Sequence, residues 1–148
     1  MTMTDLWADN LSYVFGLASV ERRVGVYSLC RYYPEFWGGQ QSRPQDKVQT
    51  LRRTCLVLNH EAGHMFGIWH CVLYKCSMNG SNSLADADNT PLDYCPVCHR
   101  RLLWNVRADG TKRYRDLIRF YRKHGLDHEA IWTEQRLMRW RQIDAATK

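Results

Sequence analysis

Long apolar runs are missing from this sequence. The uninterrupted apolar stretches extend over only a few residues, whereas a helix that spans a membrane needs about 20, so we expect no membrane contact. A secretory segment is also missing, because Met1–Asp5 offer neither a basic start nor an apolar run of the needed length. These absences predict an intracellular setting, in the cytoplasm or the nucleus, where cysteines stay reduced.

Basic side chains outnumber acidic ones in this sequence. There are 21 Lys and Arg against 15 Asp and Glu, a net charge of +6, which can indicate a nucleic-acid partner. Most of the excess follows residue 98 and alternates with apolar residues at helical spacing, which is typical of solvated helix faces. No run of aromatics separates the basic residues as stacking on bases requires. We therefore expect no nucleic-acid partner, and a basic nucleic-acid-binding zinc module is the minor alternative.

Three histidines, one glutamate and one glycine have the spacing that a catalytic zinc demands. On a helix, His60 and His64 lie one turn apart on the same face, so both rings can reach one ion. Glu61 lies about 100° round the helix from His60, beside the position of a metal-bound water. His70 would point away if the helix continued. Gly67 can take the left-handed conformation that ends a helix, which would bring His70 in as the third ligand.

Four cysteines follow at spacings that also indicate a metal. They form a C-x₄-C pair and a C-x₂-C pair: Cys71, Cys76, Cys95 and Cys98. Such pairs are typical of a structural zinc site, or of two disulfides in a secreted chain. The reducing setting favours zinc, so two ligand sets without a shared residue predict two zinc ions per chain. Cys30 and Cys55 fall outside the set, and Cys55 is predicted to be buried packing on a helix.

Hydrophobic periodicity predicts an α+β fold. Short strands are expected at Met1–Leu6, Leu11–Ala18 and Arg23–Cys30, with Asp9 and Asn10 in the first turn. A loop, Pro34–Pro44, leads into a helix from Gln45 to Phe66. The expected apolar face of that helix consists of Val48, Leu51, Cys55, Leu58 and Ala62.

The chain after the glycine turn is expected to be irregular as far as Pro96, held by metal rather than by apolar packing. Two helices are predicted beyond it, at Lys112–His124 and His128–Gln142. Gly125 should end the first of these helices, and Asp127 should cap the second.

The segment from His60 to His70 reads H-E-x-x-H-x-x-G-x-x-H, and with Met78 downstream it is the metzincin signature. The run from His70 to Leu102, HCVLYKCSMNGSNSLADADNTPLDYCPVCHRRL, closely resembles the archaemetzincins. In that family a cysteine follows the third histidine, a second cysteine stands just ahead of the methionine, and a C-x-x-C comes later. The resemblance is dense over residues 54–102, thinner over residues 2–33, and fades after residue 103.

This resemblance implies a metzincin-like zincin fold: a small twisted mixed sheet packed on the active-site helix, an irregular zinc-bound C-terminal subdomain and two extra C-terminal helices. Residues 1–103 would be a partial catalytic domain that includes the second zinc site, and residues 104–148 a helical extension. The implied activity is zinc-dependent hydrolysis of peptide bonds, with Glu61 as general base. A peptide or protein substrate would lie extended along an edge strand at Val14–Ala18. Met78 would form an apolar floor below the zinc without bonding to it.

Two departures from the family accompany the resemblance. The family's catalytic domain opens with a strand and a long helix ahead of the segment that Thr2–Leu6 resembles, and here we expect a shortened sheet. A catalytically silent zinc protein is therefore the alternative function, and self-association is the alternative to a monomer. Ala85 stands where the family usually carries an acidic residue, with Asp86 and Asp88 nearby.

Overall fold

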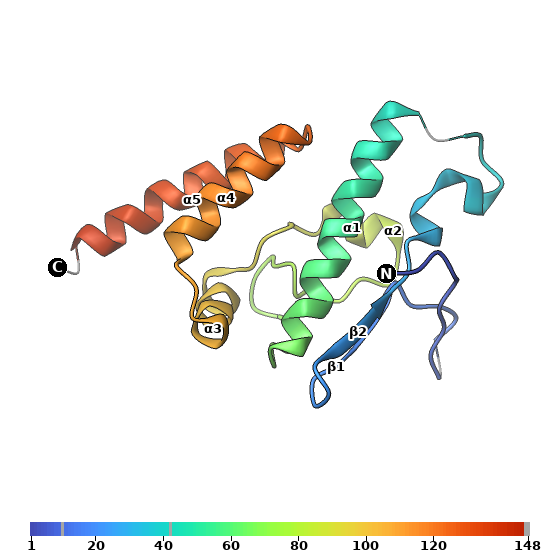
Figure 1. Ribbon diagram of the computed structural model, residues 1–148, viewed down its shortest axis with the longest axis horizontal. Coiled ribbons are helices and arrows are strands. Elements are labelled where there is room, and N and C mark those ends of the chain that lie inside the picture. Colours follow the sequence, from blue (N-terminus) through green and yellow to red (C-terminus); the bar gives the residue numbers. More distant parts are fainter. Residues whose placement is uncertain (10, 42, 147–148) are drawn as a thin grey trace. The chain divides into compact units, whose positions relative to one another are not determined.

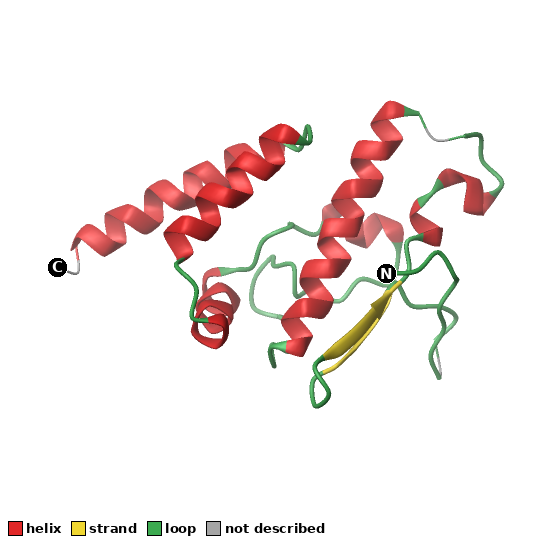
Figure 2. Cartoon of the chain, viewed as in Figure 1, coloured by secondary structure: helices red, strands yellow, loops and turns green. Residues whose placement is uncertain are grey.

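The computed structural model describes residues 1–9, 11–41 and 43–146, with side chains described as far as residue 142. The chain divides into two compact units, Met1–Leu102 and Leu103–Lys148. The first unit combines a small sheet with helices (Figures 1 and 2), so the α+β fold class is confirmed. None of the described helices is long and apolar enough to cross a membrane.

The sheet of the first unit is a short hairpin. Strand β1 (Gly16–Ser19) pairs antiparallel with β2 (Val24–Tyr27), and Gly16 lies opposite Tyr27. One parallel bridge, between Thr2 and Ser28, extends it. Both strands pack against helix α1 (Pro44–Met65), beside which the hairpin lies in Figure 1.

The predicted strand Met1–Leu6 is wrong beyond Thr2. The amide of Thr2 donates to Tyr27 O at 2.8 Å, but the amide of Thr4 then bonds the Thr2 hydroxyl at 3.0 Å. This local bond competes with strand pairing and turns the chain away from β2. Of the predicted strand Leu11–Ala18, only residues 16–18 lie in β1. Ala8 and Leu11 bridge across the predicted turn, of which Asn10 lies outside the described residues.

Helix α1 begins and ends within one residue of the prediction. Pro44 occupies the first turn, where its missing N–H costs nothing. Asp46 Oδ2 accepts the amide of Arg43 at 2.8 Å. At the other end Gly67 has a φ of 73°, and the amide of Ile68 returns to Gly63 O at 3.0 Å, a C-terminal cap that needs the left-handed residue.

The predicted apolar face of α1 is wrong. Leu58 is 43% exposed, whereas the buried residues are Thr50, Leu56, Val57, Glu61 and Gly63. The inward face carries polar groups with partners there, such as the Thr50 hydroxyl, which donates to Tyr32 O at 3.3 Å. Because periodicity counts only apolar residues, it selected a face of which two residues are exposed and three are half-buried.

Two helices were missing from the prediction for the region after Gly67. Helix α2 (Leu84–Asn89) interrupts the expected irregular stretch, and the Ser83 hydroxyl caps it by accepting the Asp86 amide at 3.1 Å. The S-x-x-D spacing that signals such a cap is visible in the sequence. Helix α3 (Pro96–Val106) starts on a proline at its first turn. Loops join these elements (Figure 2), and the stretch is irregular only in part.

The second unit is a pair of helices, α4 (Gly110–Lys123) and α5 (Asp127–Ala146), close to the two predicted ranges. Asp109 caps α4 by accepting the amides of Thr111 and Lys112. Gly125 follows the end of α4 with a φ of 71°, as expected. The prediction that Asp127 caps α5 is wrong: it is the first helical residue, and its carboxylate pairs with Arg122 at 3.3 Å.

Candidate active site

The three predicted histidines converge on one point. Nε2 of His60 lies 3.1 Å from Nε2 of His64, one helical turn along α1, and 3.2 Å from Nε2 of His70. All three ligand atoms lie within 4.8 Å of one another. Nitrogens bound tetrahedrally to zinc at about 2.0–2.1 Å would be about 3.3–3.4 Å apart. The spacing therefore fits a zinc ion with three imidazole ligands.

Backbone carbonyls orient two of these rings. His60 Nδ1 lies 2.8 Å from Ser77 O, and His64 Nδ1 lies 2.9 Å from Ile68 O. A carbonyl only accepts, so Nδ1 carries the proton and the Nε2 lone pair faces the common point. Burial lowers the pKa of His60 to about 4 and lowers that of His64. Neutral rings with facing lone pairs are what a cation requires.

The turn at Gly67 delivers His70 to the site. Ile68, which follows it, is 1% exposed and anchors the chain in the core. The amide of Cys71 then donates to Met78 O at 2.9 Å, and this bond holds the segment next to His70 in place. His70 itself remains exposed on the cleft side, so the third ligand is the most accessible one.

Glu61 is buried beside the histidines. Its side chain is only 6% exposed, and burial raises its pKa to about 7. Gly16 of β1 lies directly against it, because a Cβ at residue 16 would meet Glu61 Cγ at 2.7 Å. Sequence reasoning did not identify Gly16, and no local signal could have done so, because the contact joins residues far apart in the chain.

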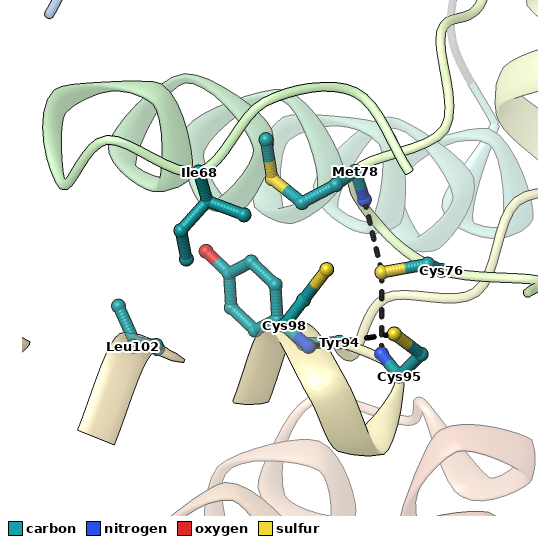
Figure 3. Close-up of a cluster of buried hydrophobic side chains, with 7 residues drawn as sticks. All are labelled: Ile68, Cys76, Met78, Tyr94, Cys95, Cys98 and Leu102. Atoms are coloured by element: carbon teal, nitrogen blue, oxygen red, sulfur yellow. Dashed lines mark hydrogen bonds between the residues drawn. The ribbon is translucent and has the colours of Figure 1, made fainter. Parts of the chain in front are cut away.

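Met78 lies beneath the helix that carries the histidines (Figure 3). It is fully buried in a cluster with Ile68 and Tyr94. Any Cβ at Gly63 would collide with Met78 Sδ, so a glycine at this point of α1 admits the methionine. Gly63 was not singled out from the sequence, although it stands inside the histidine motif.

The four predicted cysteines also gather at one place. Their sulfur atoms lie within 4.8 Å of one another, and Cys71 Sγ lies 3.9 Å from Cys95 Sγ. Sulfurs bound tetrahedrally to zinc at about 2.3 Å would be about 3.8 Å apart, whereas a disulfide requires about 2.05 Å. None of the six cysteines, all of which lie among the described residues, forms a disulfide. The geometry therefore fits a closed four-thiolate zinc site rather than disulfides.

The surroundings of these thiols favour thiolates bound to a cation. Backbone amides point at the sulfurs: that of Cys95 lies 3.2 Å from Cys76 Sγ, and that of Cys98 lies 3.5 Å from Cys95 Sγ (Figure 3). Burial raises the pKa of Cys76 to about 11, so this thiol would lose its proton at neutral pH only to a bound cation. Burial also acts to raise the pKa of Cys71, but the amides of Leu73 and Tyr74 outweigh it and lower that pKa. Cys55, predicted to be buried packing, is half-buried and belongs to neither group.

A cleft of about 890 Å³ opens above the histidines. Residues 11–18, residues 79–82, and His60, Glu61 and His64 all line it. The segment predicted to hold substrate, Val14–Ala18, therefore borders the cleft, and β1 pairs with β2 along only one edge.

The acidic residues near Ala85 have structural roles. Asp88 binds Arg53 through two short contacts of 2.7 and 2.6 Å and accepts Gln49 at 2.6 Å, which ties α2 to α1. Asp86 accepts the Ser83 hydroxyl at 2.8 Å at the start of α2. Neither carboxylate belongs to a group of potential metal ligands among the described residues.

A helix that carries H-E-x-x-H above a buried methionine, with a strand edge beside the cleft, defines the metzincin class of zinc peptidases. Within that class, the chain belongs to peptidase family M54, whose family model matches residues 1–103.

Several archaemetzincins are similar to this chain. "Archaemetzincin-2" of Pongo abelii is 34% identical over 145 residues, which cover 81% of this chain and 39% of that protein. The archaemetzincin of Thermococcus kodakarensis is 41% identical over 108 residues, 73% of this chain and 56% of that protein. The chain thus spans about two fifths to just over half the length of these relatives.

Solved structures agree in fold. The crystal structure of the archaemetzincin from Methanopyrus kandleri matches with a TM-score of 0.59 and 32% identity, over 72% of this chain and 53% of that one. A zinc-dependent peptidase from Methanocorpusculum labreanum matches with a TM-score of 0.61 and 31% identity, over 68% of this chain and 51% of that one.

Proposed function

We propose that this chain is a zinc-dependent metallopeptidase that hydrolyses peptide bonds in the cleft above α1. The observation that carries the proposal is the convergence of three Nε2 atoms beside the buried carboxylate of Glu61. His60, His64 and His70 would hold the zinc. When bound there, zinc supplies a Lewis acid that polarises the scissile carbonyl and makes water acidic enough to react near neutral pH.

Glu61 moves the proton in this proposal. Its carboxylate takes a proton from the attacking water and returns it to the leaving amine. Burial raises the pKa of this carboxyl to about 7, and the positive charge of a bound zinc ion would act in the opposite direction, toward the carboxylate that accepts the proton. The close contact with Gly16 holds the carboxylate in one place. The backbone of Val14–Ala18 would pair with an extended peptide along the cleft.

We also propose a second zinc ion at Cys71, Cys76, Cys95 and Cys98, which would stabilise the loops between α1 and α3. Residues 1–103 would then form the catalytic part and residues 104–148 a helical extension, a division supported by the reach of the family model.

The test combines metal analysis with peptide cleavage. Zinc-reconstituted protein is incubated with a peptide library, and the products are identified by mass spectrometry. Glu61→Gln should keep its zinc and lose about 10²–10⁴-fold in kcat/KM. Glu21→Gln, in the exposed hairpin turn, serves as the matched control and should retain full activity. Zinc-loaded wild type that cleaves nothing would instead identify a catalytically silent zinc protein.

A further inference from the structure

A hydrogen bond joins two segments that line the cleft. The Tyr13 hydroxyl, from the segment that leads into β1, donates to the carbonyl of Asn82 at 3.1 Å. Both residues line the cleft. An extended peptide that passed between these two segments would have to break the bond.

The aromatic ring of Tyr13 is held in place by two neighbouring side chains. The guanidinium of Arg31 lies 3.9 Å from the ring centroid, and the edge-to-face contact with Phe15 has a centroid distance of 5.4 Å. A cation over an aromatic face is attractive, more so when it is shielded from water, and the Arg31 side chain is only 15% exposed.

Arg31 is itself fixed by its neighbours. Its Nε and Nη2 donate to the two carboxylate oxygens of Asp5, each at 2.7 Å, and its carbonyl accepts Trp37 Nε1 at 3.0 Å. A two-point contact of this kind fixes orientation as well as charge. Arg31 does not line the cleft. Its contribution there is to hold Tyr13 in place.

Tyr13 lies close in the sequence to the residue that contacts the proposed general base. Gly16 touches Glu61, and Tyr13 precedes Gly16 by three residues along the chain. At about 3.3 Å per residue of extended backbone, this separation is at most about 10 Å, or about three residues of a bound peptide.

We infer that Tyr13 limits substrate length, because its bond to Asn82 joins two segments that both line the cleft. The substrates are then peptides with at most about three residues on one side of the scissile bond, whether short peptides or the ends of longer chains. On the other side there is no such limit. This inference rests on the proposed peptidase function.

The test measures binding and does not depend on turnover. The full chain is loaded with zinc, its metal content is measured, and peptide hydroxamates of graded length are titrated by calorimetry. One series extends the peptide on the amino side of the zinc-binding group, the other on the carboxyl side. Wild type should lose about tenfold in affinity beyond about three residues in one series only.

Two variants assign the limit to Tyr13. Tyr13→Phe keeps the ring and removes the bond to Asn82, so long and short ligands should bind equally in both series. Arg31→Met releases the ring and should relax the same limit. Tyr74 is 55% exposed and lies outside the cleft, so Tyr74→Phe should behave as wild type.

Three other results of these titrations would each contradict a different claim. Equal affinity at all lengths in wild type removes the length limit and leaves the peptidase proposal standing. A limit that persists in Tyr13→Phe and in Tyr13→Ala removes the role of Tyr13. Failure of every hydroxamate to bind at full zinc content overturns the proposed function and this inference together.

Discussion

Gly16 and Glu61 lie in direct contact, with no room for a side chain between them. A Cβ at residue 16 would come within 2.7 Å of Glu61 Cγ and 2.8 Å of its Oε1. Gly16 is the first residue of β1, the strand beside the cleft. The proposed substrate-binding strand therefore sets the position of the proposed general base.

Gly16→Ala should lower activity without removing metal. The new methyl group displaces the Glu61 carboxylate, and a misplacement of about 1 Å can cost about 10²-fold in rate. We expect kcat/KM to fall about 10–100-fold while zinc content stays unchanged. Gly25→Ala, on the partner strand, is the control, since it meets only the side chain of Tyr27 at 3.2 Å. Full activity in Gly16→Ala would contradict the positioning role.

Two zinc ions should leave the protein at different rates. The three-histidine site opens on the cleft and has neutral ligands, whereas the four-cysteine site is closed and mostly buried. A chelator should therefore remove the first ion while the second stays bound. Atomic absorption of dialysed samples measures how much zinc stays bound as the chelator acts. A single zinc per chain after careful reconstitution would refute the pair of sites.

Cys95→Ala should damage the fold more than Glu61→Ala. Zinc binding by four thiolates contributes on the order of 10 kcal/mol to the free energy of folding. Cys95 also lies in the core cluster with Ile68 and Tyr94. Cys55→Ala is the matched control, because that half-buried cysteine belongs to neither ligand group. Melting curves by circular dichroism compare the three variants. Equal melting temperatures for wild type and Cys95→Ala would contradict the structural role.

The contact between Asp88 and Arg53 should make stability depend on acid pH. Burial acts to raise the pKa of Asp88, but the Arg53 guanidinium outweighs it and holds that pKa below its usual value. A carboxyl with a depressed pKa in the folded state stabilises above its unfolded pKa of about 3.9, and that contribution is lost as the pH falls through the folded pKa.

Asp88→Asn should therefore cost roughly 1–2 kcal/mol at pH 7 and nothing once the wild-type carboxyl is protonated. Urea unfolding across the pH range measures the difference. Asp116→Asn removes an exposed partner of Lys112 on α4 and should change stability very little. A constant difference between Asp88→Asn and wild type down to pH 2 would argue against this linkage.

Self-association should depend on the outer face of the hairpin. Val24 and Val26 of β2 are 58% and 40% exposed and share one face, as alternate residues of a strand do. Exposed apolar surface of this kind favours contact between copies. Val24→Lys combined with Val26→Lys should shift sedimentation toward the monomer at high concentration. Wild type that sediments as a monomer throughout would contradict the prediction.

The sequence alone predicted what depends on local spacing. Helix α1, the shared face of His60 and His64, and the turn at Gly67 all follow from helical geometry and from the one residue that readily takes a positive φ. The two groups of possible ligands were identified for the same reason, because metal-ligand spacing is short-range in the chain.

Tertiary structure decided what depends on residues distant in the chain. Periodicity selected the wrong face of α1, because the buried face includes Thr50 and Glu61, whose surroundings only packing creates. The contact of Gly16 with Glu61 and the bond from Tyr13 to Asn82 join segments 45 and 69 residues apart. No local preference encodes such contacts, since they exist only once segments distant in the chain have packed together.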